Sequence, residues 1–423
     1  MSALGLLTLP LPRLLVQVAL IVLTSRALGL LVRRLGQPLV IGEIAAGIVL
    51  GPSFFGYFAP TAQALVFAPE SLKMLGLLSQ LGLVLFMFLV GLQLDPALLR
   101  GRAQTSIVVS HASIVVPFGL GCFLAAFLHP RLSLPGVPLL PFALFLGAAM
   151  SITAFPVLAR ILTEQGLLGT RIGSITLACA AIDDVTAWCI LAVVVAFTRS
   201  TGLGAAALTI GLSLAYIGFM FFCARPILKR LAARTEPANP TQTKVTLLFL
   251  CLLGSSLITE IIGIHALFGA FLFGVIVPKQ GLLPSALAEK LEGMVLVALL
   301  PLFFAQSGVR TQLGLLNSAS AWAICLLIIG VACLGKFGAS ALAARLTGLT
   351  WREASVLGVL MNTRGLMELI VLNIGLELGV IGPQLFTMMV MMALATTLMT
   401  SPLVRWLYRE TPINGRASVA SLP

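Results

Sequence analysis

The chain has 423 residues, of which 59% are hydrophobic and only 9% are charged, and its mean hydropathy is +1.10. A soluble domain carries about 25% charged residues, so this composition excludes an ordinary soluble protein and indicates one that crosses a lipid bilayer many times. The formal net charge of +12 does not indicate nucleic-acid binding, because basic residues collect in the cytoplasmic loops of membrane proteins.

Thirteen apolar runs are candidate membrane-spanning helices, each of which needs about 20 residues. They cover residues 14–32, 39–58, 74–94, 105–128, 139–162, 172–197, 205–228, 245–262, 264–278, 294–308, 320–346, 354–378 and 383–408. The ninth and tenth runs are short, which leaves twelve spans as the alternative count. Either count predicts an all-α membrane protein.

The basic residues indicate the orientation of the chain. If the N-terminus lies outside, eighteen Lys and Arg residues fall on the cytoplasmic side, five fall outside and three fall within spans. This asymmetry supports thirteen spans, with the N-terminus outside and a short cytoplasmic tail at residues 409–423. Together with the sparse tail, it favours the inner membrane of a bacterium.

The longest polar loop, residues 230–244, follows the seventh span and separates two sets of six helices. The sets are offset by seven spans, which is an odd number, so equivalent helices run in opposite directions. Such inverted repeats are typical of secondary transporters. We therefore expect two inverted six-helix repeats joined by a linker helix at residues 205–228.

The repeat pairs the fifth span with the twelfth, and both contain an interruption. A proline removes a backbone donor, and irregular backbone survives at membrane depth only where it is buried or lines a cavity. A simple proline kink is the alternative, but broken helices in matching halves point to a transport site where they cross. The residues expected to line this crossing are Ser151, Thr153, Pro156, Asn362, Thr363, Arg364 and Glu368.

Two adjacent carboxylates, Asp183 and Asp184, lie in the middle of the sixth span. Each buried charge costs at least about 2.5–3.5 kcal/mol at the centre of a membrane helix. Such a pair indicates an ion or proton site that faces a cavity or another helix. Lys336 in the eleventh span is the candidate partner, since a buried lysine can release its proton when its carboxylate moves away. Snorkelling of this lysine to the interface is the alternative.

Other charged residues within the spans favour structural roles. Arg364 stays protonated at any usable pH, and Glu368 can pair with it if the intervening turn is helical. Glu43 and Glu260 lie near helix ends. The seven cysteines show no CxxC spacing and the three histidines no HExxH pattern, so we expect neither an enzyme nor a bound cofactor.

Five stretches resemble the monovalent cation:proton antiporter-2 family, and the nearest members are bacterial sodium/proton antiporters and plant cation/proton exchangers. The stretches are QPLVIGEIAAGIVLGP at 37–52, SITAFPVLAR at 151–160, IDD at 182–184, GIHALFGAFLFG at 263–274 and NTRGLMELIVLN at 362–373. The resemblance implies the sodium/proton antiporter fold with crossing discontinuous helices. It also implies a homodimer embedded in membrane lipid.

The resemblance further implies two functional units within one transporter domain. Residues 14–94 and 245–308 would form a dimerisation domain, and residues 105–197 and 320–408 a core that moves against it. Asp184 matches the aspartate that binds the cation or proton, and Asp183 matches the one that pairs with the core lysine, here Lys336. Some family members carry a nucleotide-binding regulatory domain after the last helix; none is expected in this chain.

The function expected from these features is exchange of a monovalent cation for protons by an elevator-type movement. Sodium is the leading candidate for the cation, and potassium and lithium remain open. The two-aspartate motif favours electrogenic exchange, in line with a role in pH homeostasis. The alternatives are a cation channel or uniporter and a sodium-coupled organic-anion symporter. Proton coupling distinguishes exchange from a channel, which does not need it. The acidic pair with a buried lysine argues against the symporter, which would not need these residues.

Overall fold

The computed structural model describes residues 9–93, 103–167, 170–199, 203–233, 242–278 and 282–408. Over these residues every regular element is a helix and no strand is present, which confirms the predicted all-α class. The predicted tail at residues 409–423 lies outside the described residues.

The helices follow the predicted spans closely. The first half contains α2 (Pro10–Arg34), α3 (Leu39–Leu50), α4 (Phe55–Phe58), α5 (Pro60–Val66), α6 (Pro69–Gln93), α7 (Ala103–Leu132), α8 (Leu139–Ser151), α9 (Phe155–Glu164), α10 (Arg171–Arg199), α11 (Leu203–Phe219), the π-helix η2 (Met220–Ala224) and α12 (Arg225–Ala233). The second half contains α13 (Gln242–Ile262), α14 (Ala266–Ile276), α15 (Leu282–Met294), the π-helix η3 (Val295–Leu299), α16 (Leu300–Arg310), the 3₁₀ turn η4 (Leu313–Leu315), α17 (Ala319–Cys333), the π-helix η5 (Leu334–Gly338), α18 (Ala339–Leu346), α19 (Trp351–Met361), α20 (Leu366–Glu377) and α21 (Pro383–Tyr408).

Within the described part of the chain, nine helices are long and apolar enough to cross a membrane, and the bent pair α19–α20 makes a tenth span. The other three predicted spans coincide with shorter helical segments: α8 with α9, α14 alone, and α15 through α16. The count of thirteen therefore stays a prediction beyond these ten.

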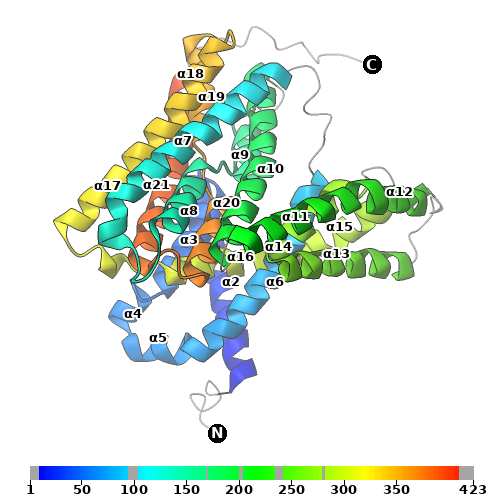
Figure 1. Ribbon diagram of the computed structural model, residues 1–423. Coiled ribbons are helices and arrows are strands. Elements are labelled where there is room, and N and C mark those ends of the chain that lie inside the picture. The colour runs from blue at the N-terminus through cyan, green and yellow to red at the C-terminus, as the bar shows by residue number, and fades with distance from the viewer. Residues whose placement is uncertain are drawn as a thin grey trace, which may run out of the picture.

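The helices pack as two bundles. In the first bundle α3 packs against α2 and α16, and α6 packs against α14 and α16. In the second bundle α7 packs against α8, α10 and α18, and α21 packs against α17 and α19. Figure 1 shows the second bundle in the upper part of the molecule and α11–α12 beside α13 and α15 on the right.

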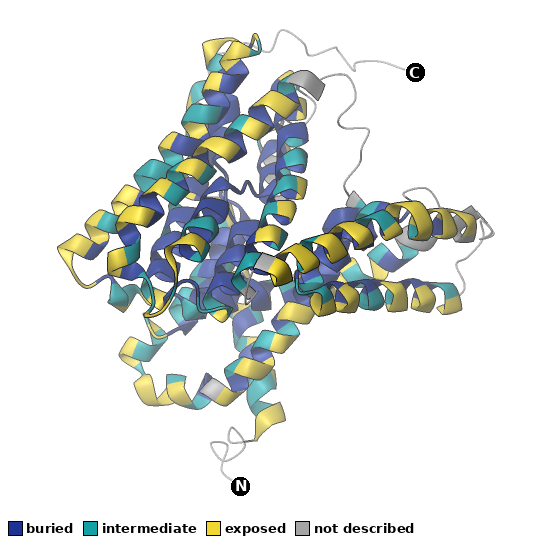
Figure 2. Ribbon diagram, viewed as in Figure 1, coloured by how far each residue is buried: buried dark blue, intermediate teal, exposed yellow. Residues whose placement is uncertain are grey.

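The outer surface of both bundles is apolar. Large hydrophobic side chains stay exposed along the helices, while the buried residues line the inside of the fold (Figure 2). Phe123 of α7 is 79% exposed and Phe222 of η2 is 83% exposed. Exposed apolar patches of this extent mark a membrane or protein contact, so these faces are suited to lipid.

Glycines let helices of the first bundle approach at backbone distance. A Cβ atom at Gly47 of α3 would overlap the backbone of Ala305 in α16, and one at Gly308 of α16 would overlap the backbone of Ile44. Small residues at such contacts allow close packing of membrane helices, where van der Waals contact replaces the hydrophobic effect as the driving force.

We expect Gly47→Ala to lower the free energy of unfolding by about 1–3 kcal/mol, because the added methyl group must push α3 away from α16. The matched control is Gly330→Ala in α17, where a Cβ atom meets nothing within 4 Å; there the better helix propensity of alanine should be neutral or stabilising. Thermal unfolding of both purified variants in detergent measures the difference. Equal midpoints for the two variants would contradict the packing argument.

Candidate functional site

Two helix breaks meet in the middle of the second bundle. The chain is extended between α8 and α9, with ψ of 140° at Ile152 and 90° at Ala154. Pro156 lies in the first turn of α9, where its missing N–H costs nothing, so the proline starts a new half-helix. The second break separates α19 from α20, which are bent by 41°.

The breaks touch each other directly. The amide of Ala154 donates to the carbonyl of Thr363 at 3.1 Å, and the Thr153 hydroxyl donates to the carbonyl of Met361 at 3.3 Å. Backbone groups freed by the breaks therefore satisfy one another, as buried irregular backbone requires.

Two cations cap the carboxyl end of α8. Arg364 donates to the carbonyl of Ala149 at 3.0 Å and to that of Met150 at 2.7 Å. Lys336 donates to the carbonyl of Ser151. A helix carboxyl end carries partial negative charge and unpaired carbonyls, so these two side chains neutralise the end of the half-helix inside the membrane.

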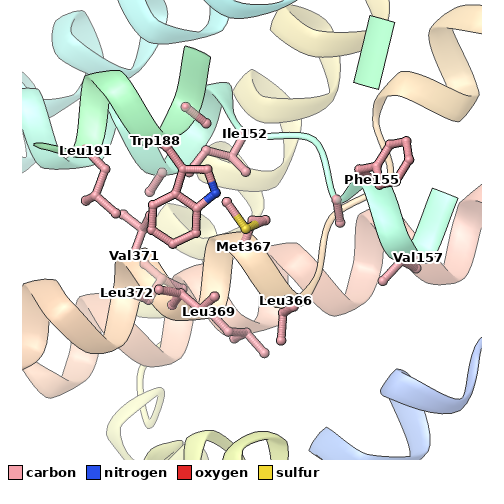
Figure 3. Close-up of a cluster of buried hydrophobic side chains, with 14 of the residues drawn as sticks. Ile152, Phe155, Val157, Trp188, Leu191, Leu366, Met367, Leu369, Val371 and Leu372 are labelled. Atoms are coloured by element: carbon pink, nitrogen blue, oxygen red, sulfur yellow. The ribbon is translucent and has the colours of Figure 1, made fainter. Parts of the chain in front are cut away.

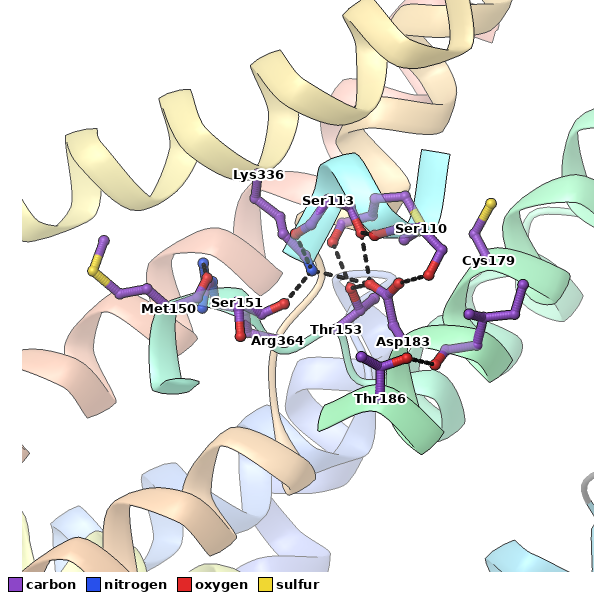
Figure 4. A network of polar contacts seen from close by, with 12 residues as sticks. Ser110, Ser113, Met150, Ser151, Thr153, Cys179, Asp183, Thr186, Lys336 and Arg364 are labelled. Carbon is purple, nitrogen blue, oxygen red and sulfur yellow. Dashed lines mark hydrogen bonds and ion pairs between the residues drawn. The ribbon is translucent and has the colours of Figure 1, made fainter. Parts of the chain in front are cut away.

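The carboxylate of Asp183 is held by four donors (Figure 4). Ser110 of α7 donates to Oδ1 at 2.5 Å. Ser113 of α7 and Thr153 donate to Oδ2 at 2.8 and 2.7 Å. Lys336 in η5 completes the set with an ion pair of 3.0 Å. Asp183 and Lys336 are both fully buried, and the charge and hydrogen-bonding capacity of this carboxylate are well satisfied.

The neighbouring carboxylate of Asp184 has the opposite environment. It is only 1% exposed, and neither of its oxygens has a hydrogen-bond partner among the described residues. It lies near the amide of Phe155 at the start of α9. A buried, unpaired carboxylate is costly unless a proton or a cation occupies it. Of the two acids, Asp184 is therefore the one whose oxygens have acceptor capacity that the described residues leave unused.

The second break brings further polar groups into the same region. Arg364 lies 3.7 Å from Glu368, one turn on in α20, and neither oxygen of Glu368 has a hydrogen-bond partner among the described residues. Thr397 of α21 accepts from the amide of Arg364 at 3.1 Å and donates to its carbonyl at 2.6 Å. α21 thereby supports the irregular backbone between α19 and α20.

Several predicted lining residues point away from the acid pair. The Ser151 hydroxyl donates to the carbonyl of Ala148 in its own helix, so Ser151 contributes its carbonyl to the site. Thr363 bonds Thr400 of α21 at 3.4 Å. Asn362 donates to the sulfur of Cys333 at 3.5 Å. Of the predicted hydroxyls only that of Thr153 reaches an acid, and it bonds Asp183 rather than Asp184.

Sequence reasoning missed Ser110 and Ser113, which supply half of the donors to Asp183. The available signal was their spacing, because Ser106, Ser110 and Ser113 recur every three or four residues in an otherwise apolar run and so share one face of α7. All three are fully buried. A serine stripe of this kind on a membrane helix indicates a polar partner on a neighbouring helix.

Apolar side chains surround the crossing (Figure 3). Trp188 lies one helical turn after Asp184 in α10 and is 2% exposed. Its ring stacks on Phe271 of α14 in the first bundle, with a centroid distance of 6.0 Å. The two bundles therefore meet in aromatic contact beside the acid pair.

Cavities of unequal size lie between the bundles. One of about 450 Å³ is lined by Arg26, Glu43, Val157 and Leu366, among others, and reaches the starts of both α9 and α20. At the far end of α20 lie a cavity of about 30 Å³ beside Asn373 and one of about 340 Å³ lined by Gln80, Glu260 and Glu377, among others. The described residues contain no group of three or more His, Cys, Asp or Glu side chains suited to a metal ion.

Polar contacts close the far end of α20 against the first bundle. Arg310 of α16 donates to Asn373 at 2.8 Å and pairs with Glu377 at 3.1 Å. Asn373 in turn donates to Ser307 of α16 at 2.8 Å, and Gln80 of α6 donates to Glu377 at 3.2 Å. We call these five residues the Arg310 cluster.

Comparison with known families decides the classification. The family described as "Sodium/hydrogen exchanger, transmembrane" matches residues 18–408, which is most of the chain. The chain belongs to the sodium/hydrogen exchanger family. This confirms the resemblance found in the sequence and places the protein among transporters, not enzymes.

Relatives within this family differ in length. The Na⁺/H⁺ antiporter NhaS4 of Synechocystis is 45% identical over 93% of this chain and 97% of its own length. Cation/H⁺ antiporter 17 of Arabidopsis thaliana is 43% identical over 94% of this chain. K⁺/H⁺ antiporter 1 of Saccharomyces cerevisiae is 33% identical over 98% of this chain. The chain spans about half the length of these last two relatives, 49% and 48%.

The fold also matches a solved antiporter. The sodium proton antiporter MjNhaP1 of Methanocaldococcus jannaschii aligns with a TM-score of 0.68, covering 95% of this chain and 99% of its own, at 14% sequence identity. The expected antiporter fold is thereby confirmed.

Proposed function

We propose that the protein exchanges a monovalent cation for protons, with Asp184 as the group that binds both. The contrast between two adjacent acids carries this proposal: Asp183 accepts from four donors, whereas Asp184 has no hydrogen-bond partner among the described residues. The names of the relatives, which are antiporters of Na⁺ or K⁺ and H⁺, support the same activity.

One carboxylate that holds either ion is sufficient for exchange. A bare carboxylate is too costly to move through apolar surroundings, whereas a protonated or cation-bound one is neutral. Asp184 therefore passes from facing one side of the membrane to facing the other with a cation bound in one direction and with a proton bound in the other. Asp183 keeps its ion pair with Lys336 and fixes the position of α10 against α7, η5 and the break after α8. The amino end of α9 lies beside Asp184 and offsets the charge of this carboxylate when it holds no ion.

We infer that the second bundle moves against the first in an elevator-type cycle, with the first bundle forming a homodimer. Residues 105–197 and 320–408 would make up the moving core, residues 14–94 and 245–308 the dimerisation domain, and residues 205–228 the linker. The crossing, the acid pair and both capping cations all belong to the second bundle, so the site can travel as one unit. Packing of the helices mainly within each bundle supports this division.

The positive charge distribution supports an orientation with the N-terminus outside the cell membrane and the C-terminus in the cytoplasm. In that orientation the cavity that reaches the starts of α9 and α20 opens to the cytoplasm. The outer cavities are lined by residues of the Arg310 cluster, and Trp188, Phe271 and that cluster lie between them and the acid pair. This arrangement corresponds to an inward-facing state. Water and cations would reach Asp184 past the starts of α9 and α20.

Linking the bundles at the Arg310 cluster is expected to stop exchange, because outward opening must separate α20 from α16. We would introduce Ser307→Cys and Asn373→Cys, whose native side chains bond at 2.8 Å, after replacing the seven native cysteines. A short bifunctional maleimide should then reduce the exchange rate at least tenfold. Proton flux in proteoliposomes measures the effect.

The matched control for this experiment joins two helices of the same bundle. Cys122 of α7 lies 3.4 Å from the carbonyl of Ala143 in α8. A second variant that keeps Cys122, lacks the other six native cysteines and carries Ala143→Cys can therefore be linked by the same reagent, and exchange should persist. Unchanged exchange after complete linkage of positions 307 and 373 would rule out relative movement of the bundles at this contact.

Proton coupling separates the antiporter from the cation channel that the sequence left as an alternative. Proteoliposomes with an acidic interior, clamped at zero membrane potential, should lose internal protons when Na⁺, Li⁺ or K⁺ is added outside. Sodium is our first candidate, and the ion that gives the largest flux identifies the substrate. Cation uptake without proton efflux would support the channel instead. Acceleration of exchange by an imposed potential would support the electrogenic cycle that the two-aspartate motif favours.

A further inference from the structure

A cavity of about 500 Å³ lies where the turn between α2 and α3 meets the end of α21. Leu35 and Gln37 line it from the first bundle, and Ser401, Arg405 and Trp406 are among the residues that line it from the second. No Asp or Glu among the described residues lines it, and Arg405 is the one charged residue of its described lining. The cavity therefore carries a positive charge and lies across the boundary between the two bundles.

A proline fixes one wall of the cavity. Pro402 lies within α21 and has no amide N–H, so the carbonyl of Leu398, four residues earlier, lacks its usual partner in the helix. The side chain of Gln37, just before α3, donates to that carbonyl at 3.1 Å. This bond holds the start of α3 against α21 beside the cavity.

Two hydrogen-bond donors on one face of α21 have no protein partner. Ser401 and Arg405 are four residues apart and so lie one above the other. Ser401 is only 2% exposed; its hydroxyl bonds no described residue, and its oxygen stays accessible from the cavity. The Nε of Arg405 donates to the side chain of Gln165 at 3.3 Å, whereas its two terminal nitrogens have no acceptor among the described residues. The cavity therefore offers unused donors to an anion.

The turn between α2 and α3 leaves room for the arginine. Gly36 has a φ of +69°, which favours glycine, and a Cβ atom there would overlap the guanidinium of Arg405. Two exposed basic residues, Arg33 and Arg34, end α2 just before this turn. The guanidinium is thus held in place by the turn and by Gln165, in a region of positive charge.

The mouth of the cavity is apolar. Leu35 is 69% exposed and Trp406 is 72% exposed, so both side chains lie on a surface suited to lipid. In the orientation proposed above, this mouth lies at the cytoplasmic surface of the membrane, where tryptophan side chains gather and anionic lipids attract basic residues. An occupant with an anionic head and an apolar tail matches both parts of the cavity.

We propose that this cavity binds the phosphate head group of an anionic phospholipid. The phosphate oxygens accept from the hydroxyl of Ser401 and from the terminal nitrogens of Arg405, since guanidinium and phosphate form strong charge-assisted hydrogen bonds. The acyl chains lie over Leu35 and Trp406. This binding does not depend on the proposed exchange reaction, because neither acid of the pair lines the cavity.

The test measures the thermal midpoint of the purified full-length protein in detergent micelles that contain increasing fractions of phosphatidylglycerol or of phosphatidylcholine. Phosphatidylglycerol should reach half of its maximal stabilisation at a roughly fivefold lower fraction, which is the gain from one arginine beside an anionic lipid. The choline head group carries a positive charge of its own, which Arg405 repels. Inorganic phosphate at the same total concentration should leave the midpoint unchanged, because it has no chain to cover the apolar mouth.

Two variants assign the effect to this cavity. Arg405→Gln should raise the half-maximal fraction of phosphatidylglycerol to that of phosphatidylcholine. Ser401→Ala, whose native hydroxyl bonds no described residue, should raise it about threefold, the gain from one hydrogen bond. The matched control is Arg345→Gln, which removes a charge at the end of α18, outside the cavity, and should leave the fraction unchanged.

Three results would overturn the proposal. The first is an equal half-maximal fraction for the two lipids, and the second is an equal loss in Arg345→Gln and Arg405→Gln, which would indicate attraction by the surface charge alone. The third is stabilisation by inorganic phosphate without lipid, which would make this a site for a soluble anion.

Discussion

Replacing Asp184 with asparagine is expected to reduce cation-dependent proton exchange more than about a hundredfold. The amide is nearly the same size as the carboxylate, but it can neither take up a proton nor carry the charge that a cation needs. The loss should appear in proteoliposomes for every cation that the wild-type protein transports.

The thermal stability of Asp184→Asn should not fall together with its exchange activity. Because neither oxygen of Asp184 is hydrogen-bonded among the described residues, Asp184→Asn removes an uncompensated buried acid and should leave the thermal midpoint equal or higher. Asp183→Asn is the matched control. It leaves the buried Lys336 without its ion-pair partner, which is expected to cost about 3–5 kcal/mol while reducing exchange less than Asp184→Asn does.

These two variants therefore separate the roles of the adjacent acids. Wild-type exchange by Asp184→Asn would refute the assignment of the binding group. Identical losses of exchange and of stability in both variants would mean that the acids act as one unit, and that the division between a structural and an ion-binding carboxylate is wrong.

Replacing Arg364 with methionine is expected to destabilise the fold by about 3–5 kcal/mol, as much as the loss of the Asp183–Lys336 ion pair. The guanidinium donates to the carbonyls of Ala149 and Met150 and lies 3.7 Å from Glu368. Removing it leaves two carbonyls and one acid unpaired in a fully buried place. Thermal unfolding in detergent should show a much lower midpoint and a low yield of folded protein.

Two further variants identify the cause of this loss. Arg364→Lys should give an intermediate midpoint, because a single ammonium group cannot match the fork that reaches both carbonyls. Combining Arg364→Met with Glu368→Gln should recover part of the stability, since the acid is then no longer left as an unpaired charge. A wild-type midpoint for Arg364→Met would contradict the capping role.

The acid pair, the buried lysine and both helix breaks were visible in the sequence because the chain is so apolar. In a run such as residues 172–197, a carboxylate stands out against its neighbours, and its cost demands an explanation. The pairing of Pro156 with the polar cluster around Arg364 followed from counting spans. The structure adds that the proline lies in the first turn of the half-helix α9 and that Arg364 caps the carboxyl end of the preceding half-helix, α8.

The hydroxyl partners of Asp183 could not be read from the sequence in the same way. A serine or threonine in a membrane helix can satisfy itself on its own backbone, as Ser151 does, so its presence alone predicts no partner. Only the three-dimensional arrangement distinguishes Ser151 from Ser110 and Ser113. The same holds for Thr397, which supports the second break from another helix.

The central claim is that one carboxylate, that of Asp184, binds the proton and the cation in competition. The most direct test is to add Na⁺, Li⁺ or K⁺ to the purified protein in weakly buffered detergent solution and to follow the pH. Competition predicts that the transported cation releases up to one proton per protomer, and that Asp184→Asn releases none while Asp183→Asn still does. Proton release that persists in Asp184→Asn, or cation binding that releases no proton from the wild-type protein, would contradict the shared site.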